Sequence, residues 1–156
     1  MPQGLACRPA ELKNRLGIAI GRKAYAEYRA YFSTDRWLRL MNEGARPQRL
    51  LFASTGTKDP EASDTLYVSG LVAPYTVDTT PEPTLHAFAD HGKVDRVLAA
   101  DPAEADALLA AFAAAGVDVE AVGAELQVKG AESFVASWTS LMGRIADKAG
   151  QLAGAR

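Results

Sequence analysis

A cluster of hydroxyl, glycine and lysine residues follows a short apolar segment in the first half of the chain. Residues 49–54 read "RLLFAS", and "TGTK" comes directly after them. The side chains of Ser54 and Thr55 offer hydroxyl donors, while Gly56 lets the backbone approach a ligand closely. Lys58 supplies the positive charge that a phosphate group requires. These residues predict a phosphate-binding loop, with a plain polar turn as the alternative.

Two more specific uses of this loop are disfavoured. A Walker A loop requires Gly, four residues, and then Gly-Lys-Ser/Thr, and the spacing here does not match it. Lys58 could also act as a Schiff-base nucleophile, but such a lysine is best held on a strand that faces a barrel interior. Lys58 instead lies in a loop, four residues beyond Ser54.

Few other side chains are arranged for catalysis. Asp78 lies near the carboxyl end of a second predicted strand, where it either points into a site or forms a turn. His86 is expected on a helix and His91 in its last turn, where imidazole suits the negative end of the helix dipole. Neither histidine has a visible serine or cysteine nucleophile as partner. Cys7 is the only cysteine, so we expect a free thiol and no metal site.

The N-terminal half of the chain predicts two helices and two strands. The spacing of apolar residues in "PAELKNRLGIAIGRKAYAEYRAYF" predicts one long amphipathic helix from Pro9. A shorter helix, "DRWLRLMNE", follows a cap at Ser33, Thr34 or Asp35, and Gly44 ends it. Strands are predicted near residues 49–54 and 75–79, and we expect both to be fully buried in a parallel sheet.

The remaining elements are predicted to be helical. "SDTLYVSGL" suits a short helix capped by Ser63 or Asp64. Thr80 is expected to cap the next helix, with Pro81 at its first position and Gly92 at its end. Helices over residues 102–150 complete the chain, with Asp101 as a cap and Gly116 as a stop. Alternating strands and helices indicate an α/β fold, but a sheet of only two strands looks like part of something larger.

Composition excludes two classes of partner. The chain has 17 Lys and Arg against 19 Asp and Glu, with a formal net charge of -2. We therefore expect neither nucleic-acid nor membrane binding. The start "MPQGLACRPAELKNR" lacks a signal-peptide pattern, and no apolar run reaches the ~20 residues of a membrane span. We accordingly expect a cytoplasmic protein.

A longer stretch carries a resemblance to a known family. Residues 46–92, "RPQRLLFASTGTKDPEASDTLYVSGLVAPYTVDTTPEPTLHAFADHG", resemble the last third of bacterial transaldolases of the longer actinobacterial and cyanobacterial subgroup. "GIAIGRKAYAEY" is similar to that subgroup's helix before the seventh barrel strand, and "GAESFVASWTSLMGRIADKA" to its C-terminal helix. The resemblance covers roughly residues 12–149.

The resemblance implies a partial barrel. Transaldolases are (β/α)8 TIM barrels of about 250 residues or more, and "RLLFAS" and "YTVDT" are similar to strands seven and eight. The first six strands, the Schiff-base lysine and its acidic partners then have no counterpart, so residues 1–156 are expected to be a C-terminal fragment without catalytic residues. Ser54 and Lys58 match positions that face the sugar phosphate. "VDTTP" departs from the family's "VNTMP", which leaves the role of Asp78 open.

The family's activity implies the function. Transaldolases transfer a dihydroxyacetone unit from sedoheptulose 7-phosphate to glyceraldehyde 3-phosphate through a lysine Schiff base, in the pentose phosphate pathway of carbohydrate metabolism, without a cofactor. We expect the isolated chain to be inactive, because losing the nucleophile removes the mechanism itself. The alternatives are one half of a split enzyme, completed by an N-terminal barrel fragment, and a non-catalytic helical interaction module. The split enzyme predicts an exposed apolar strand edge.

Overall fold

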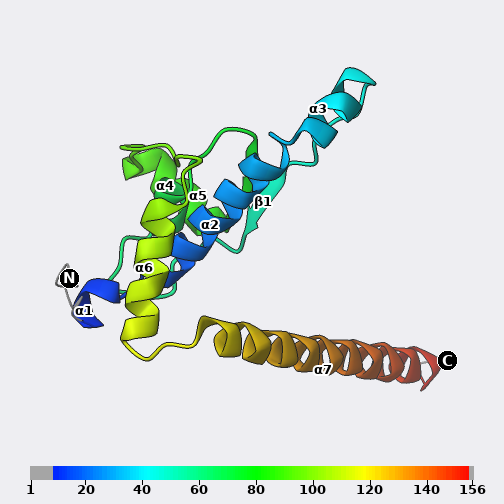
Figure 1. The fold of residues 1–156 in the computed structure, drawn as a ribbon. Helices are drawn as coiled ribbons and strands as arrows, with labels where there is room; N and C mark the ends of the chain where they lie inside the picture. The colour runs from blue at the N-terminus through cyan, green and yellow to red at the C-terminus, as the bar shows by residue number, and fades with distance from the viewer. Residues whose placement is uncertain (1–8, 155–156) are drawn as a thin grey trace. The chain divides into compact units, whose positions relative to one another are not determined.

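The structure, a computed structural model, describes residues 9–154 of the chain. Cys7 lies outside the described residues. The chain divides into two compact units, Met1–Ala115 and Gly116–Arg156. In chain order the elements are α1 (Pro9–Leu12), α2 (Leu16–Tyr31), α3 (Asp35–Asn42), β1 (Leu50–Ala53), α4 (Leu66–Gly70), β2 (Thr76–Thr79), α5 (Glu82–His91), α6 (Ala103–Ala114) and α7 (Val119–Gly154) (Figure 1).

The single long helix predicted from Pro9 is wrong, because the chain breaks between α1 and α2. Asn14 adopts a left-handed conformation with φ 62°, which no helix interior accommodates. The Asn14 side chain donates a hydrogen bond of 2.7 Å to Asp59, and Lys13 pairs with Asp59 at 3.2 Å. The break is therefore held by contacts with a loop that lies 45 residues further along the chain.

The second helix, α3, agrees with its sequence signals. The Thr34 hydroxyl accepts a hydrogen bond from the backbone N–H of Trp37 at 3.3 Å, so Thr34 is the cap among the three candidates. Gly44 lies just beyond the helix with φ 98°, a conformation that glycine adopts without steric cost.

The two strands pair in parallel, so the predicted α/β class is confirmed. Leu50 pairs with Thr76 and Ala53 with Thr79. One face of this sheet is covered by a core that includes Tyr25 of α2 and Phe52 of β1. The core also contains Leu71 and Leu98, while α6 packs alongside α2 (Figure 1). The hydrophobic core of the first unit thus lies between the sheet and these helices.

The expectation of two fully buried strands is wrong. Leu51 and Ala53 are exposed and lie in register with Val77 and Thr79 of β2. Because side chains alternate along a strand, these residues share the face opposite Phe52. Leu51 keeps 51% of its surface exposed. No described part of the first unit covers this face. The sequence "RLLFAS" alone could not reveal this exposure.

Two glycines let α2 and α4 approach each other closely. A Cβ atom on Gly17 would lie 2.9 Å from the Tyr67 ring, and one on Gly21 would lie 2.6 Å from Leu71. Real Cβ atoms do not come this close, so a larger residue would require the Tyr67 or Leu71 side chain, or α4 itself, to shift. Both helices therefore cover the same face of the sheet, at a spacing that these glycines permit.

The starts of the later helices differ in detail from expectation. Thr80 does not cap α5: Pro81 is its N-cap residue and the helix begins at Glu82. Pro81 has ψ 148°, so it is extended rather than in the first helical turn. Helix α6 begins at Ala103 after Pro102, although the Asp101 carboxylate accepts a hydrogen bond from the Ala103 N–H at 3.0 Å. Ser63 accepts one from the N–H of Thr65, the N-cap residue of α4, at 3.3 Å.

The second unit is one helix, α7, of 36 residues. Gly123, Gly130 and Gly143 lie within it without interrupting it. The helix exposes large apolar side chains within its own unit, among them Phe134 and Trp138. By length and composition no single described helix could cross a membrane, although α6 and α7 pass the same test together as a bent pair.

Candidate functional site

The β1 loop, residues 54–58, begins with an unusual backbone conformation. Ser54 follows the last residue of β1 and has φ 58°, in the left-handed region. For a residue with a side chain this conformation costs about 1–2 kcal/mol. Residues held in this left-handed backbone conformation cluster at ligand-binding and catalytic sites, where the surrounding structure holds them in place. Ser54 is exposed, so its hydroxyl is accessible to a ligand.

Thr55 connects the carboxyl ends of the two strands. Its side chain is buried, and its hydroxyl donates a hydrogen bond of 2.7 Å to the Asp78 carboxylate on β2. The same hydroxyl lies 3.4 Å from the carbonyl oxygen of Thr79. Thr55 and Asp78 therefore fix the end of β1 against the end of β2. Of the two roles considered for Asp78, the turn is wrong: it lies within β2, paired in register with Phe52.

Gly56 lies against the start of α5. A Cβ atom at this position would come within 2.9 Å of the Pro81 ring. Glycine is therefore required for the loop to approach Pro81 this closely. The Thr57 hydroxyl, next in the chain, is buried without a hydrogen-bond partner among the described residues.

Lys58 carries the only positive charge of the β1 loop, and among the described residues its ammonium forms no ion pair, whereas the neighbouring carboxylates pair with Lys13. Its neighbour Asp59 instead binds Asn14 and Lys13, and Glu61 binds Lys13 at 2.6 Å. The hydrogen bond from Asn14, followed by the Glu61 backbone N–H and Lys13, lowers the pKa of Asp59 to about 2. The adjacent carboxylates are thus held away from Lys58, which remains exposed to solvent.

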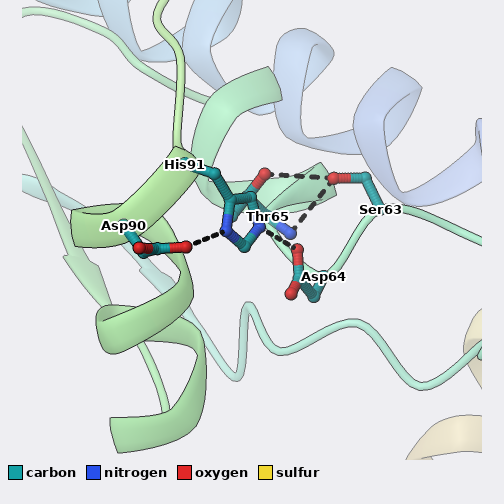
Figure 2. Close-up of polar contacts among 5 residues, drawn as sticks. All are labelled: Ser63, Asp64, Thr65, Asp90 and His91. Atoms are coloured by element: carbon teal, nitrogen blue, oxygen red, sulfur yellow. Dashed lines mark hydrogen bonds and ion pairs between the residues drawn. The ribbon is translucent and has the colours of Figure 1, made fainter.

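A second polar cluster joins the segment before α4 to the end of α5 (Figure 2). His91 contacts Asp64 through Nε2 at 2.9 Å and Asp90 through Nδ1 at 3.2 Å. The hydrogen bond with Asp64, then that with Asp90, raises the pKa of His91. Ser63 bonds to Thr65 at 3.0 Å rather than to the imidazole, so these residues do not form a nucleophile and base.

A cleft of ≈ 530 Å³ lies beside this cluster. Arg22, Lys93 and Arg96 line it, which would suit an anion. However, Glu104 forms ion pairs with both Arg22 and Arg96, and these contacts lower the pKa of its carboxyl. Both guanidinium groups are therefore engaged within the protein, although one carboxylate balances only one of their two charges. Lys58 of the β1 loop has no such ion pair among the described residues, so this loop is the better candidate. No group of three or more potential metal ligands occurs among the described residues.

Comparison with known proteins identifies the family. A family model for transaldolase/fructose-6-phosphate aldolase matches residues 3–145. The chain belongs to this family. It is 47% identical over 141 residues to a transaldolase of Frankia alni, a match that covers 90% of this chain and 38% of the relative.

Other transaldolases match this chain with similar identity and coverage. The chain is 49% identical over 147 residues to a transaldolase of Arthrobacter sp. (strain FB24), covering 93% of this chain and 38% of that protein. It is 48% identical over 139 residues to a transaldolase of Thermobifida fusca, a match that covers 88% of this chain and 38% of that protein. The chain therefore spans about 38% of the length of these curated transaldolases. The family resemblance inferred from residues 46–92 is confirmed.

The structure assigns different surroundings to the predicted transaldolase site residues. Ser54 and Lys58 are exposed, Thr55 is buried in a contact between strands, and Gly56 packs on Pro81. Sequence reasoning missed the bond between Thr55 and Asp78 and the contact between His91 and Asp64. The residue types gave no sign of either pairing, because the partners lie 23 and 27 positions apart.

Proposed function

We propose that the β1 loop forms one wall of a sugar-phosphate site in a transaldolase-type enzyme. The observation that carries this proposal is the uncompensated charge of Lys58, whose neighbouring carboxylate Asp59 is engaged by Asn14. In this proposal the Lys58 ammonium and the Ser54 hydroxyl contact the phosphate. The Thr55 hydroxyl is already bonded to Asp78, so it positions the loop, and Gly56 provides close access to the backbone.

The proposed reaction is the transfer of a dihydroxyacetone unit from sedoheptulose 7-phosphate to glyceraldehyde 3-phosphate. A lysine attacks the ketose carbonyl, the carbon-carbon bond breaks with release of an aldose phosphate, and the retained unit passes to the acceptor. Lys58 does not fit the role of nucleophile, because no carboxylate within the described residues is placed to exchange protons with it. The reacting lysine and its acidic partners then belong to a part of the enzyme that this chain does not span.

We further propose that the enzyme serves the pentose phosphate pathway in the cytoplasm, with no metal or organic cofactor, and that the isolated chain has no turnover. Residues 1–156 are then the part of the barrel that contains its last two strands. Family membership and the parallel pairing of β1 with β2 support this assignment. Sugar phosphates are the proposed substrates of the completed enzyme only.

Borohydride trapping tests the absence of a nucleophile. The isolated chain is incubated with fructose 6-phosphate and treated with borohydride. The mass of the intact protein is then measured by mass spectrometry. We expect no mass increase. A covalent adduct on Lys58 or on any other lysine would overturn the proposal that the nucleophile lies elsewhere.

A titration tests the phosphate wall directly. Fructose 6-phosphate is added to the isolated chain while the backbone amide signals of residues 54–58 are followed by NMR. We expect Lys58→Ala to weaken binding about 10-fold, because one charge-assisted hydrogen bond contributes about 1.5–3 kcal/mol. Lys93→Ala, which removes an exposed lysine from the other cleft, should leave the affinity unchanged. A larger loss of affinity in Lys93→Ala than in Lys58→Ala would assign the phosphate to that cleft.

A second candidate is a non-catalytic helical interaction module. The exposed apolar residues of α7 favour it, with Phe134 82% and Trp138 65% exposed. Its test is fructose 6-phosphate binding by the full chain: a chain that shows no response at residues 54–58 would favour the module over the enzyme.

A further inference from the structure

The carboxylate of Asp59, the residue that follows Lys58, has both oxygen atoms engaged within the protein. Its Oδ2 atom accepts a hydrogen bond of 2.7 Å from the side-chain amide of Asn14 and lies 3.2 Å from the ammonium nitrogen of Lys13. Its Oδ1 atom accepts a hydrogen bond of 3.0 Å from the backbone N–H of Glu61. We call these three contacts the Asp59 clamp. Although Lys58 and Asp59 are neighbours in the described part of the chain, they form no ion pair with each other.

Two backbone turns orient the partners in the Asp59 clamp. Asn14 has φ 62°, and this left-handed conformation is one that asparagine adopts more readily than most residues. It turns the chain between α1 and α2, and the Asn14 side chain reaches a residue 45 positions away. On the other side, the carbonyl oxygen of Asp59 accepts a hydrogen bond of 3.1 Å from the N–H of Ala62. The clamp is therefore held by the backbone on both sides.

The clamp engages the negative charge that lies beside Lys58 in the sequence. Asp59 and Glu61 are both carboxylates, and Lys13 contacts each of them, at 3.2 Å and 2.6 Å. A released Asp59 carboxylate would be tethered next to Lys58 at a high effective concentration. It would compete with a dissolved phosphate for the lysine ammonium, and its own charge would repel the phosphate. Phosphate binding at the β1 loop therefore requires that this carboxylate be held elsewhere.

The clamp also keeps the Asp59 carboxylate ionised. Its contacts with Asn14, the Glu61 N–H and Lys13 lower the pKa of Asp59 to about 2, so the charge persists at neutral pH. Protonation therefore does not remove this competitor for Lys58, and only its position does. A clamp that served the break between α1 and α2 alone would need an acceptor for Asn14, which a neutral amide oxygen also provides. Substitution of Asp59 can therefore separate the two roles.

We propose that Asn14 and Lys13 are positioning residues of the phosphate site in the β1 loop. They hold the Asp59 carboxylate away from Lys58, so that the lysine ammonium is free to bind the phosphate group of a sugar phosphate. Neither residue contacts the phosphate itself, because both act through Asp59. The inference rests on the proposed function, since it names residues that control the charge of the same site. It assigns a binding role to the break between α1 and α2.

A neutral substitution opens the clamp without changing the charge of the protein. Asn14→Gly deletes the amide and keeps the left-handed backbone, which glycine adopts without steric cost. Fructose 6-phosphate is titrated into the full chain while the amide signals of residues 54–58 are followed by NMR. We expect the affinity to fall about 3- to 5-fold, toward the upper end of what an exposed ion pair contributes. NMR relaxation should also show slower motion of the Lys58 ammonium group, because it now pairs with Asp59.

Removing the competing charge should restore binding. Asp59→Asn keeps an oxygen that accepts hydrogen bonds and removes the negative charge. In the double variant with Asn14→Gly, we expect an affinity for fructose 6-phosphate at least equal to that of the unmodified chain. A merely structural role of Asn14 predicts a different result, since the loss of support for the break would then weaken binding in both backgrounds.

Two further variants complete the set. Asn42→Gly makes the same neutral change at the exposed last residue of α3 and should leave the affinity unchanged. Lys13→Gln weakens the clamp and leaves Asn14 in place, and its loss of affinity should be smaller in the Asp59→Asn background than alone. This variant tests the inference even if circular dichroism shows that Asn14→Gly is poorly folded.

Two results would overturn the inference: an affinity for fructose 6-phosphate that Asn14→Gly does not change, or an equal loss of affinity with and without Asp59→Asn. Either result leaves the proposed function intact as long as residues 54–58 respond to the ligand. The failure of the proposed function gives a different pattern. Residues 54–58 then respond in no variant, while slower motion of the Lys58 ammonium in Asn14→Gly would still support the separation of Asp59 from Lys58 by the clamp.

Discussion

The hydroxyl of Thr55 donates a hydrogen bond of 2.7 Å to the carboxylate of Asp78, and this bond joins the ends of the two parallel strands. It holds the loop that carries Ser54 in a fixed relation to β2. Because Thr55 is only 4% exposed, water does not readily replace the bond. The site and the stability of the first unit thus depend on the same side chain.

Removing this bond should destabilise the first unit. Thr55→Val keeps the shape of the side chain and deletes the donor, so we expect a loss of about 1–2 kcal/mol in the free energy of unfolding, measured with urea. Thr79→Val is the control, because the Thr79 side chain is exposed on β2 and makes no hydrogen bond that would be lost. Equal effects of the two substitutions would contradict a structural role for the Thr55 hydroxyl.

Two glycine-to-alanine substitutions should have opposite effects on stability. Gly56→Ala places a Cβ atom 2.9 Å from Pro81 and should cost about 1–3 kcal/mol of unfolding free energy. Gly123→Ala meets nothing within 4 Å and lies in α7, where alanine favours the helix by about 1 kcal/mol. Urea unfolding and helix content by circular dichroism measure the two changes. A neutral Gly56→Ala would show that the loop can move away from Pro81.

The pKa of Asp59 should depend on Asn14. The folded-state pKa is about 2, below the ordinary 3.8, so ionised Asp59 stabilises the fold above pH 3.8 and this contribution is lost as the pH falls toward 2. In Asn14→Ala the largest cause of the shift disappears, and we expect the pKa to move up toward 3.8. A carbon-detected NMR titration of the carboxyl group measures it. An unchanged midpoint would assign the shift to the Glu61 backbone N–H and Lys13 instead.

His91 should give the opposite pH dependence. Its folded-state pKa is raised above 6.5 by Asp64 and Asp90, so the stabilisation is fully present below pH 6.5 and is lost as the pH rises through the folded value. Asp64→Asn should lower the pKa of His91, as an imidazole NMR titration would show. Asp95→Asn removes a carboxylate that does not contact His91 and should leave the pKa where it is. A shift in both variants would indicate a general charge effect.

Local signals in the sequence predicted local features. Thr34 and Gly44 bound α3 as their residue types suggest, and each predicted strand range contains the observed strand. Features that depend on distant partners were missed. Asn14 interrupts a helical pattern because Asp59 binds its side chain, and periodicity carries no information about such a partner.

The exposure of the sheet could not be predicted from the strand sequences. An apolar run such as "RLLFAS" favours burial on both faces, yet Leu51 is half exposed because no described part of its unit covers it. For the site, family resemblance singled out Ser54 and Lys58, and their role in binding stays a prediction. The structural roles of Thr55 and Gly56 became apparent only from contacts with Asp78 and Pro81.

The brevity of β1 affects how the chain selects among partners. With four residues, Leu50–Ala53, its open edge offers too few backbone bonds to hold an arbitrary extended segment. Backbone pairing is also nearly independent of sequence, whereas the fit of side chains against Ile20 and Ala24, which line a groove between α2 and β1, depends on it. At such a short edge the side chains around β1, and not its backbone, decide which segments can pack there.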